Sequence, residues 1–346
     1  MPSDRPIIVV GCPRSGTTML QLMLHAHPRI AIPPETRFVL AAYRERRDFG
    51  DLREPANREA LARRIADRRE TRFCDLGLDR DAAVARMTAA DGTLGSVLGT
   101  VFQMYAERFG KPRWGDKRPA YLHNIDLLLR LFPDAQFVNI VRDGRDCVAS
   151  LKEMSWHRKD IYATVAAWAR AVDDARRAAR RLGPAQWFEF RYEDLVADPH
   201  GKLTELCGYL GEDYDPAMAE PSAVAEVAVP SFKTWHSRTH TPVTSERVRS
   251  WQTRLTTEEI ALCEAALGSR LVANGYELSG TSRPAPAQLL RYGWTAAPQR
   301  LEPARRTLSR AASRLRRDQD LAHPPTTVVS PRRSTDASGR VDAGPR

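Results

Sequence analysis

Short apolar runs alternate with amphipathic segments along the first 280 residues. The runs Ile7–Val10, Phe137–Val141 and Trp187–Phe190 are rich in β-branched and aromatic residues, as buried parallel strands are. Each run leads through a turn into a segment with apolar residues at helical spacing. This alternation predicts an α/β fold, with a parallel sheet covered by helices on both faces.

The same periodicity predicts individual helices. One runs from Thr17 to the stop at Pro28, a second spans Leu122–Leu131, and a long one covers Ile161–Leu182. Arg/Ala/Glu-rich helical stretches fill the chain between about 36 and 110, another helix starts at about 144, and more follow up to about 275. We find no internal repeat.

The composition changes after Gly280, where Pro, Ala, Ser and Arg dominate. This change predicts a folded domain of residues 1–280 and an Arg-rich, low-complexity tail of residues 281–346. The last thirty or so residues have a composition that is typical of disordered segments. Ahead of them, apolar residues at helical spacing predict one face of a basic amphipathic helix. These residues are Leu301, Ala304, Leu308, Ala311 and Leu315. Such a helix could contact a membrane surface, or the tail could be a soluble appendage.

The net charge of +10 belongs mostly to that tail. Residues 281–346 contain 13 Arg, no Lys and 5 acidic residues, whereas residues 1–280 contain 40 basic and 38 acidic residues. A nucleic-acid-binding face would place its basic residues on the folded body. We therefore expect no specific nucleic-acid partner.

The five cysteines are odd in number and never form a close pair, which argues against a disulfide framework and a zinc site. No apolar run approaches the roughly 18 residues of a membrane span, and the N-terminus lacks a signal-peptide pattern. We expect a protein of the reducing cytoplasm.

The stretch GCPRSGTT follows the first predicted strand and has the glycine spacing of a phosphate-binding loop. Gly11 and Gly16 match that pattern, but Thr17 stands where the lysine belongs, and Arg14 has entered the loop. A glycine turn at a helix N-terminus still offers backbone N–H groups and a positive dipole end to an anion. A strand-to-helix turn that only packs closely is the ordinary alternative.

The missing lysine changes which anion fits. A nucleoside triphosphate with Mg²⁺ needs that positive charge. An anhydride between one phosphate and one sulfate needs less, and N–H groups, one guanidinium and hydroxyls can hold it without a metal. Arg14 provides the guanidinium, and Ser15, Thr17 and Thr18 provide the hydroxyls.

The runs PRSGTT, LHAHP and ETR together resemble the sulfotransferases that use 3′-phosphoadenosine 5′-phosphosulfate (PAPS), and the protein-tyrosine branch in particular. The resemblance extends over about 25 residues at consistent spacing. It implies a P-loop-like fold and transfer of a sulfuryl group to a hydroxyl-bearing acceptor, with no metal required. A P-loop kinase of a small molecule and a nucleic-acid binder are the alternatives, and Thr17 argues against the kinase.

PAPS also carries a 3′-phosphate, which requires a second anion site. Arg142 directly follows the strand FVNIV, at the carboxyl end where open parallel sheets bind ligands, and Ser150 lies eight residues later in the next helix. This pair is similar to the 3′-phosphate motif of the family. Alternatively, Arg142 pairs with Asp143 or Asp146 at a charged helix start.

The resemblance implies further donor contacts. Tyr192 matches a position near the nucleotide in relatives, although a packing tyrosine is equally consistent. Ser237 and Arg249 lie where the family has a late loop that closes over the nucleotide. Met154 is a departure, because relatives of the protein-tyrosine branch have a basic residue four positions after the serine.

Glu35 matches the general base of the protein-tyrosine enzymes. A glutamate at this place also suits the N-terminus of a helix expected over Thr36–Tyr43. Other sulfotransferases use histidine as the base. His25 and His27 fit packing or helix-end roles better, and His123 is a more distant candidate.

Lys117 matches the lysine that relatives place on the bridging oxygen of the donor. Sulfuryl transfer should resemble phosphoryl transfer, in which negative charge builds on the leaving oxygen. Lys117 and Arg14 would stabilise that charge while Glu35 takes the hydroxyl proton. Asp116 is expected to be either an orienting or a solvated carboxylate.

The acceptor is left open by the sequence. The protein-tyrosine branch holds acidic peptides through basic residues beside the glutamate; Arg37 retains one of them, but Ala41 replaces the next. A small molecule, a lipid, a sugar and a peptide tyrosine all remain candidates. A homodimer also remains open.

Overall fold

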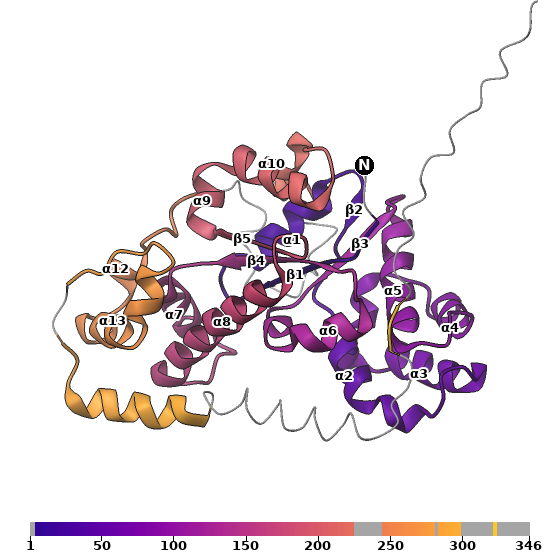
Figure 1. The fold of residues 1–346 in the computed structure, drawn as a ribbon, viewed down its shortest axis with the longest axis horizontal. Coiled ribbons are helices and arrows are strands. Elements are labelled where there is room, and N and C mark those ends of the chain that lie inside the picture. Colours follow the sequence, from indigo (N-terminus) through magenta and orange to yellow (C-terminus); the bar gives the residue numbers. More distant parts are fainter. Residues whose placement is uncertain (1–3, 225–243, 281–282, 299–320, 324–346) are drawn as a thin grey trace, which may run out of the picture.

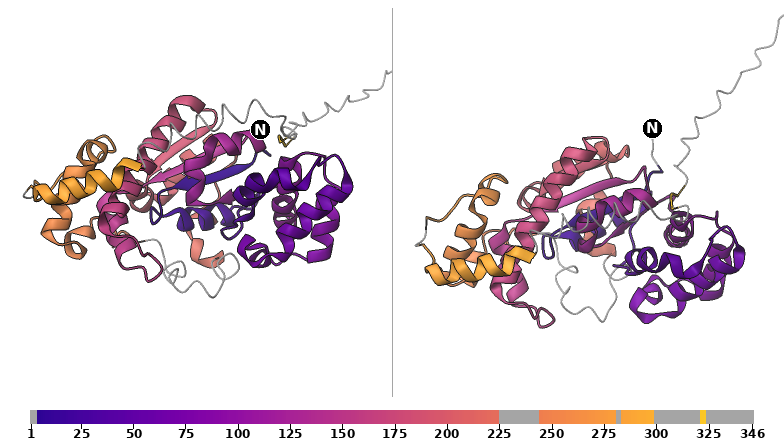
Figure 2. Two further views of the ribbon diagram at one scale, coloured as in Figure 1. Left: turned by 90° about the horizontal axis from the view of Figure 1, so that it is seen from below. Right: turned by 60° about the horizontal axis from the view of Figure 1, so that its bottom comes forward.

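A five-stranded parallel sheet forms the centre of the protein, with helices on both faces (Figures 1 and 2). The computed structural model describes residues 4–224, 244–280, 283–298 and 321–323. The strand order is β2-β3-β1-β4-β5, so β1 lies in the middle. The predicted α/β fold is confirmed. The strands are β1 (Ile7–Gly11), β2 (Ile30–Ala31), β3 (Arg113–Lys117), β4 (Gln136–Val141) and β5 (Trp187–Arg191).

The residues of β1 show why the sheet is covered on both sides. Ile7 and Val9 belong to the apolar core under α1 (Thr17–Ala26), α9 (Tyr192–Ala197) and α10 (Pro199–Leu210). Ile8 and Val10 belong to the larger core on the opposite face. Successive side chains of a strand point to opposite faces, so a continuous apolar run suits a strand that is buried on both.

The sequence analysis did not predict two of the strands. β2 has only two residues, and β3 has the sequence RWGDK, which contains no apolar run although all five residues are buried. Arg113 lies inside because Glu212 pairs with it at 3.0 Å and Gln136 accepts from it at 2.5 Å. Paired charges of this kind make a buried strand look polar.

The helices largely follow the predicted periodicity. The long helix is found at the predicted residues, the one predicted over Leu122–Leu131 starts with a 3₁₀ segment, and the one expected from Thr36 starts at Phe38. The α-helices are α1 (Thr17–Ala26), α2 (Phe38–Glu45), α3 (Pro55–Asp67), α4 (Arg80–Thr88), α5 (Leu94–Arg108), α6 (Ile125–Leu131), α7 (Gly144–Lys152), α8 (Ile161–Leu182), α9 (Tyr192–Ala197), α10 (Pro199–Leu210), α12 (Trp251–Arg254), α13 (Thr257–Val272) and a further helix at 286–298.

Short 3₁₀ segments connect several of these helices. They are η1 (Arg46–Phe49), η2 (Arg69–Thr71), η3 (Phe73–Leu76), η4 (Pro119–Asn124), η5 (Pro216–Ala219) and η6 (Pro221–Val224). The helices α2 to α4 form a lobe at one end of the molecule, and α12, α13 and residues 286–298 lie at the other end (Figure 1). Within the described part of the chain, no helix has the length and apolarity to cross a membrane.

Part of the predicted tail packs on the body. The N–H of Gly95 donates to the carbonyl of Leu321 at 2.8 Å, and the N–H of His323 donates to the carbonyl of Leu131 at 2.7 Å. The expectation of disorder over the last thirty residues is therefore wrong for residues 321–323. The amphipathic face predicted between Leu301 and Leu315 lies outside the described residues.

Candidate active site

The loop between β1 and α1 has a conformation that requires its glycines. Gly16 has φ 99°, and a Cβ added there would lie 2.6 Å from the ring of Tyr192. A Cβ on Gly11 would lie 2.7 Å from the Ser15 hydroxyl and 2.8 Å from the carbonyl of Ile140. Distances below 3 Å leave no room for a side chain, so both glycines are needed for the backbone to approach its neighbours this closely.

The loop presents hydrogen-bond donors that the protein itself does not use. Gly16 caps α1 without a side-chain acceptor, and the first turn of α1 contains no acidic residue. The Ser15 side chain is fully buried, yet its hydroxyl has no hydrogen-bond partner among the described residues. Buried polar groups are normally paired. These donors at the positive end of a helix dipole suit a phosphate or sulfate group.

The two predicted anion sites meet in space. The Arg14 Nε donates to the Ser150 hydroxyl at 3.0 Å, and the Arg142 guanidinium donates to the Arg14 carbonyl at 3.1 Å. Arg142 follows β4 and Arg14 follows β1, and these strands are neighbours in the sheet. Burial and the nearby Arg142 charge lower the pKa of Arg14. Concentrated positive charge of this kind favours an anion between the two residues.

The charged helix start predicted as an alternative is also present. The Arg142 guanidinium lies 3.8 Å from Asp146, while Asp143 pairs with Arg145 at 2.7 Å. Arg142 is buried, and its Nε has no hydrogen-bond partner among the described residues. The local ion pair therefore leaves Arg142 with a donor for a ligand.

Asp146 holds the start of α12, a role that the sequence analysis missed. One of its carboxylate oxygens accepts from the Ser250 hydroxyl at 2.9 Å and from the Trp251 N–H at 2.8 Å. The carbonyl of Arg247 accepts from Arg142 at 2.6 Å. Residues 247–251 thus lie against Arg142 and Asp146, and the sequence signal for this contact was the position of Asp146 one helical turn after Arg142.

The remaining predicted donor contacts fall in different places. The Tyr192 ring packs against the Arg142 guanidinium, with its centroid 4.5 Å from Cζ, so its packing role is confirmed and its contact with the nucleotide stays a prediction. The structure does not bring Arg249 to the site, because its exposed side chain pairs with Glu277 at 3.2 Å. Ser237 lies outside the described residues.

Lys117 connects the phosphate loop with Glu35. Its Nζ lies 3.7 Å from a Glu35 carboxylate oxygen and 3.4 Å from the Thr18 hydroxyl. Lys117 ends β3, which is paired with β1, so its side chain is buried beside the loop. Burial lowers the pKa of Lys117, and the charge of Glu35 opposes this shift. The site therefore contains an acid–base pair next to the anion-binding loop.

Glu35 stands outside the helix that follows it. Because α2 begins at Phe38 with Arg37 as its N-cap residue, Glu35 does not belong to the first turn of that helix. About three tenths of its side chain is exposed, whereas Lys117 is almost completely buried. The carboxylate is therefore positioned by Lys117 on one side and open to a second reactant on the other.

Asp116 links the elements that bear Glu35 and Lys117. The carboxylate accepts from the Tyr121 hydroxyl at 2.5 Å, the Lys117 N–H at 2.8 Å and the Thr36 hydroxyl at 3.2 Å. Burial raises its pKa to about 6, and the three hydrogen bonds limit this rise. This orienting role agrees with the expectation for Asp116, but its partners were not predicted because β3 was not recognised.

The three candidate histidines have structural partners. His25 is buried, its Nδ1 accepts from the N–H of Ile32 at 3.2 Å, and burial lowers its pKa to about 3. His27 Nε2 lies 2.9 Å from the carbonyl of Asp213, and His123 Nδ1 lies 2.5 Å from a carboxylate of α8. Among the described residues, no group of three or more His, Cys, Asp or Glu side chains is placed to bind a metal ion.

Comparison with known proteins places this site in a family context. Residues 6–216 match the model of the sulfotransferase family. The chain is 28% identical to the nodulation protein NoeE of Sinorhizobium fredii over 307 residues, which cover 80% of this chain and 68% of that protein. It is 26% identical to protein-tyrosine sulfotransferase 2 of Gallus gallus over 215 residues, which cover 60% and 52% of the two chains.

The fold is shared with solved structures. The sulfotransferase domain from the curacin biosynthetic pathway superimposes with a TM-score of 0.54 at 20% identity, covering 80% of this chain and all of that domain. The chain spans about two thirds of the length of the nodulation protein and about half that of the protein-tyrosine sulfotransferase. Because the family model covers more than half of the chain, the chain belongs to the sulfotransferase family.

Proposed function

We propose that the chain transfers the sulfuryl group of PAPS to the hydroxyl of an acceptor. The observation that carries this proposal is the hydrogen bond between Arg14 and Ser150. It joins the loop expected to bind the phosphosulfate, which follows β1, to the helix expected to bind the 3′-phosphate, which follows the neighbouring strand β4. A single phosphate site would suit many ligands. Two linked sites at one edge of the sheet suit a nucleotide with anions at both its 5′ and 3′ positions.

The residues present fit that cosubstrate. The Ser15 hydroxyl, which has no partner within the described ranges, and the N–H groups at the start of α1 would hold the 5′-phosphosulfate. The Arg142 Nε, which likewise has no partner among the residues that the structure describes, would hold the 3′-phosphate together with the Ser150 hydroxyl. The ring of Tyr192 supports both halves, because it packs against Arg142 and leaves room only for a glycine at position 16.

The chemistry is divided between Glu35 and Lys117. Glu35 accepts the proton of the acceptor hydroxyl as the new bond between oxygen and sulfur forms. PAPS supplies the sulfuryl group, and the bond between sulfur and the bridging oxygen breaks to leave 3′,5′-adenosine bisphosphate (PAP). Lys117 and Arg14 stabilise the negative charge that develops on the leaving phosphate. No step requires a metal ion.

Thermal shift measurements test this function against the kinase alternative. PAP, ATP with Mg²⁺ and a DNA oligomer are compared as ligands of the full chain. A ligand at a hundredfold excess over its Kd raises the free energy of unfolding by about 2.7 kcal/mol. Of the three ligands, we expect only PAP to raise the Tm. Stabilisation by ATP with Mg²⁺ and none by PAP would transfer the assignment to a kinase, which Thr17 at the lysine position disfavours.

The acceptor belongs to the class of hydroxyl compounds. Beside Glu35, Arg37 is exposed and Ala41 supplies no second charge, so we do not favour an acidic peptide over neutral alcohols and phenols. Mass spectrometry on a panel of phenols, sugars, lipid alcohols and tyrosine peptides identifies the acceptor by the gain of one sulfonate. Sulfonation of acidic tyrosine peptides and of no other compound in the panel would contradict this equal weighting and assign the chain to peptide acceptors.

A further inference from the structure

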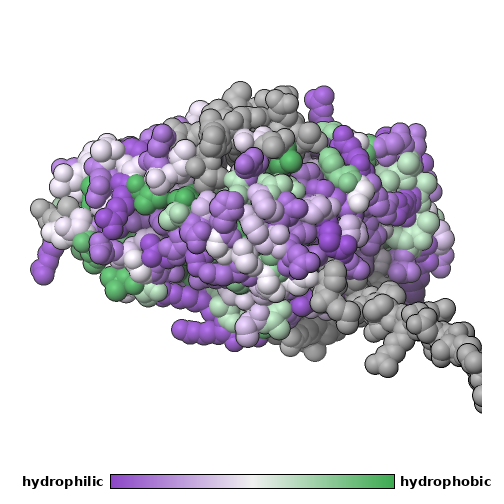
Figure 3. All heavy atoms as spheres, turned by 90° about the horizontal axis from the view of Figure 1, so that it is seen from above, coloured by the Kyte–Doolittle hydropathy of each residue, from purple (hydrophilic) through white to green (hydrophobic). Residues whose placement is uncertain are grey.

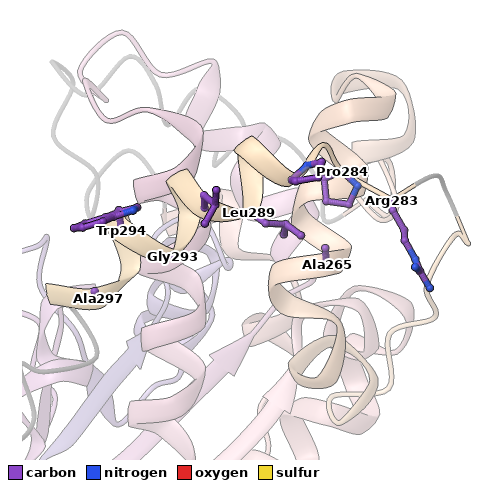
Figure 4. Close-up of a pocket in the computed structure, with 9 residues that line it drawn as sticks. Ala265, Arg283, Pro284, Leu289, Gly293, Trp294 and Ala297 are labelled. Carbon is purple, nitrogen blue, oxygen red and sulfur yellow. The ribbon is translucent and has the colours of Figure 1, made fainter.

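Apolar surface away from the active site indicates no particular partner. The face of the molecule in Figure 3 is mainly hydrophilic, with small scattered apolar patches. The helix at 286–298 exposes Trp294 beside α13 (Figure 4), but no described contact shows what covers this side chain. By contrast, charged side chains around the proposed donor site, which contains Arg14, Arg142 and Ser150, have defined partners.

Glu153 and Arg254 form an ion pair between the end of α7 and the end of α12. The Nε and Nη2 of Arg254 each donate to one carboxylate oxygen of Glu153 at 2.6 Å, which is the bidentate geometry of a strong pair. The Arg254 Nη1 also donates to the Ser250 hydroxyl at 3.0 Å, and that hydroxyl donates to Asp146. The pair therefore belongs to the contact between α7 and residues 247–254.

This ion pair lies within the electric field of the donor site. The hydrogen bonds from Arg254 lower the pKa of Glu153, and partial burial opposes this shift. The charges of Arg247 and Arg14 lower the same pKa further. Arg14 is the loop residue that donates to Ser150, and Ser150 lies on α7 three positions before Glu153. The carboxylate of Glu153 thus stands at the edge of a site built for anions.

The interaction between Glu153 and this site is reciprocal. Arginines that favour the ionised carboxylate have part of their positive charge compensated by it in return. A phosphate bound near Arg14 and Ser150 would be repelled by Glu153. Arg254 would attract the same phosphate and also neutralises Glu153, so the two partners act on a bound anion with opposite sign.

We propose that the Glu153–Arg254 pair sets the affinity of the donor site for its nucleotide. Glu153 weakens the hold on the phosphate near Ser150, and Arg254 strengthens it. A carboxylate that lowers the affinity for PAP favours release of this product after transfer. The inference rests on the proposed function, because PAP is the ligand that function requires.

A pair that only fastens α12 to α7 would behave differently. Loss of either partner would then loosen the same contact, so both single variants would bind PAP more weakly. A pair that acts through its charges changes the affinity in opposite directions when one partner or the other is neutralised. The sign of the two effects therefore separates the two roles.

Titration calorimetry of the full chain with PAP at low salt measures these signs. The Kd should fall about three- to tenfold in Glu153→Gln and rise by a similar factor in Arg254→Gln, as expected for one charge acting on a phosphate through partly screened surroundings. The double variant loses one charge of each sign and should return close to the unaltered chain. All differences should shrink in high salt, which would not alter a purely structural effect in this way.

A matched pair on another helix serves as the control. Lys202 and Glu205 pair at 2.7 Å on α10, a helix that carries no residue assigned to the donor site. Lys202→Gln and Glu205→Gln should each leave the Kd for PAP unchanged. Thermal unfolding of the same samples checks that each variant is folded.

The outcomes separate this inference from the proposed function. If the unaltered chain binds PAP but both Glu153→Gln and Arg254→Gln bind it more weakly, the pair is a structural contact, and the inference fails while the proposed function stands. An unchanged Kd in Glu153→Gln would overturn the inference in the same way. Absence of PAP binding in the unaltered chain would overturn the proposed function, and this inference with it.

Discussion

The Nε of Arg14 donates a hydrogen bond to the hydroxyl of Ser150 at 3.0 Å, across 136 positions of sequence. The contact ties the loop after β1 to the helix after β4, and a further bond from Arg142 to the Arg14 carbonyl closes the connection. A ligand bound to the loop after β1 is therefore expected to contact the residues that follow β4 as well. Four predictions test this arrangement and the candidate catalytic residues beside it.

Glu35→Gln should abolish most of the turnover and leave PAP binding intact. Glutamine keeps the size of the side chain but cannot accept the proton, and removal of a general base costs about 10²- to 10⁴-fold in rate. Turnover is measured from sulfonated product, and PAP binding from the shift in Tm. Glu59→Gln, a change to an exposed glutamate on α3, serves as the control. Unchanged turnover in Glu35→Gln would remove this residue from the role of base.

Arg142→Ala should weaken PAP but not adenosine 5′-phosphate, which lacks the 3′-phosphate. A hydrogen bond to a charged group contributes about 1.5–3 kcal/mol, so the Kd for PAP should rise about 10- to 150-fold. Titration calorimetry with both nucleotides measures the difference. Lys152→Ala, at the exposed C-terminal end of α7, the helix that follows Arg142, should change neither Kd. Equal losses for the two nucleotides would mean that Arg142 does not recognise the 3′-phosphate.

Gly16→Ala should destabilise the protein and impair PAP binding. The residue has φ 99°, and the new Cβ would lie 2.6 Å from the Tyr192 ring, so the loop must shift. We expect a loss of about 1–3 kcal/mol in the free energy of unfolding, measured with urea. Gly208→Ala within α10 meets no atom within 4 Å and should be neutral or stabilising by up to about 1 kcal/mol. Similar effects of the two substitutions would contradict the close packing of the loop.

Asp116→Asn should change how stability depends on pH. The folded-state pKa of Asp116 is raised from 3.8 to about 6, so between these values the native state holds a proton that the unfolded chain releases. The contribution of Asp116 is fully present below the lower value and is lost as the pH rises through the higher one.

Urea unfolding at pH 4, 5, 6 and 7 measures this contribution. Relative to the Asp116→Asn variant, the unaltered chain should lose on the order of 2–3 kcal/mol of unfolding free energy as the pH rises from 4 to 7. Asp81→Asn, a change to an exposed carboxylate on α4, should leave the pH profile unaltered. A constant difference between the unaltered chain and Asp116→Asn would show that burial does not raise this pKa.

Local sequence determined the donor site to a large extent. The strand, the glycine loop and the helix that starts at Thr17 follow each other directly, so the phosphate-binding turn is encoded by neighbouring residues. Arg142 and Ser150 were recognisable for the same reason, because a strand end and two turns of helix set their spacing. The order of strands and helices along the chain was sufficient to predict the parallel sheet.

Only the tertiary structure decided how the candidate catalytic residues meet. β3 looks polar because its charges are paired inside the fold, so periodicity did not predict this strand, and only the resemblance to sulfotransferases suggested that Lys117 acts beside the loop after β1. Asp116 reaches Thr36 across 80 positions, and Asp146 reaches Ser250 across 104. Contacts of this range depend on how strands and helices pack in three dimensions, and local periodicity carries no information about that packing.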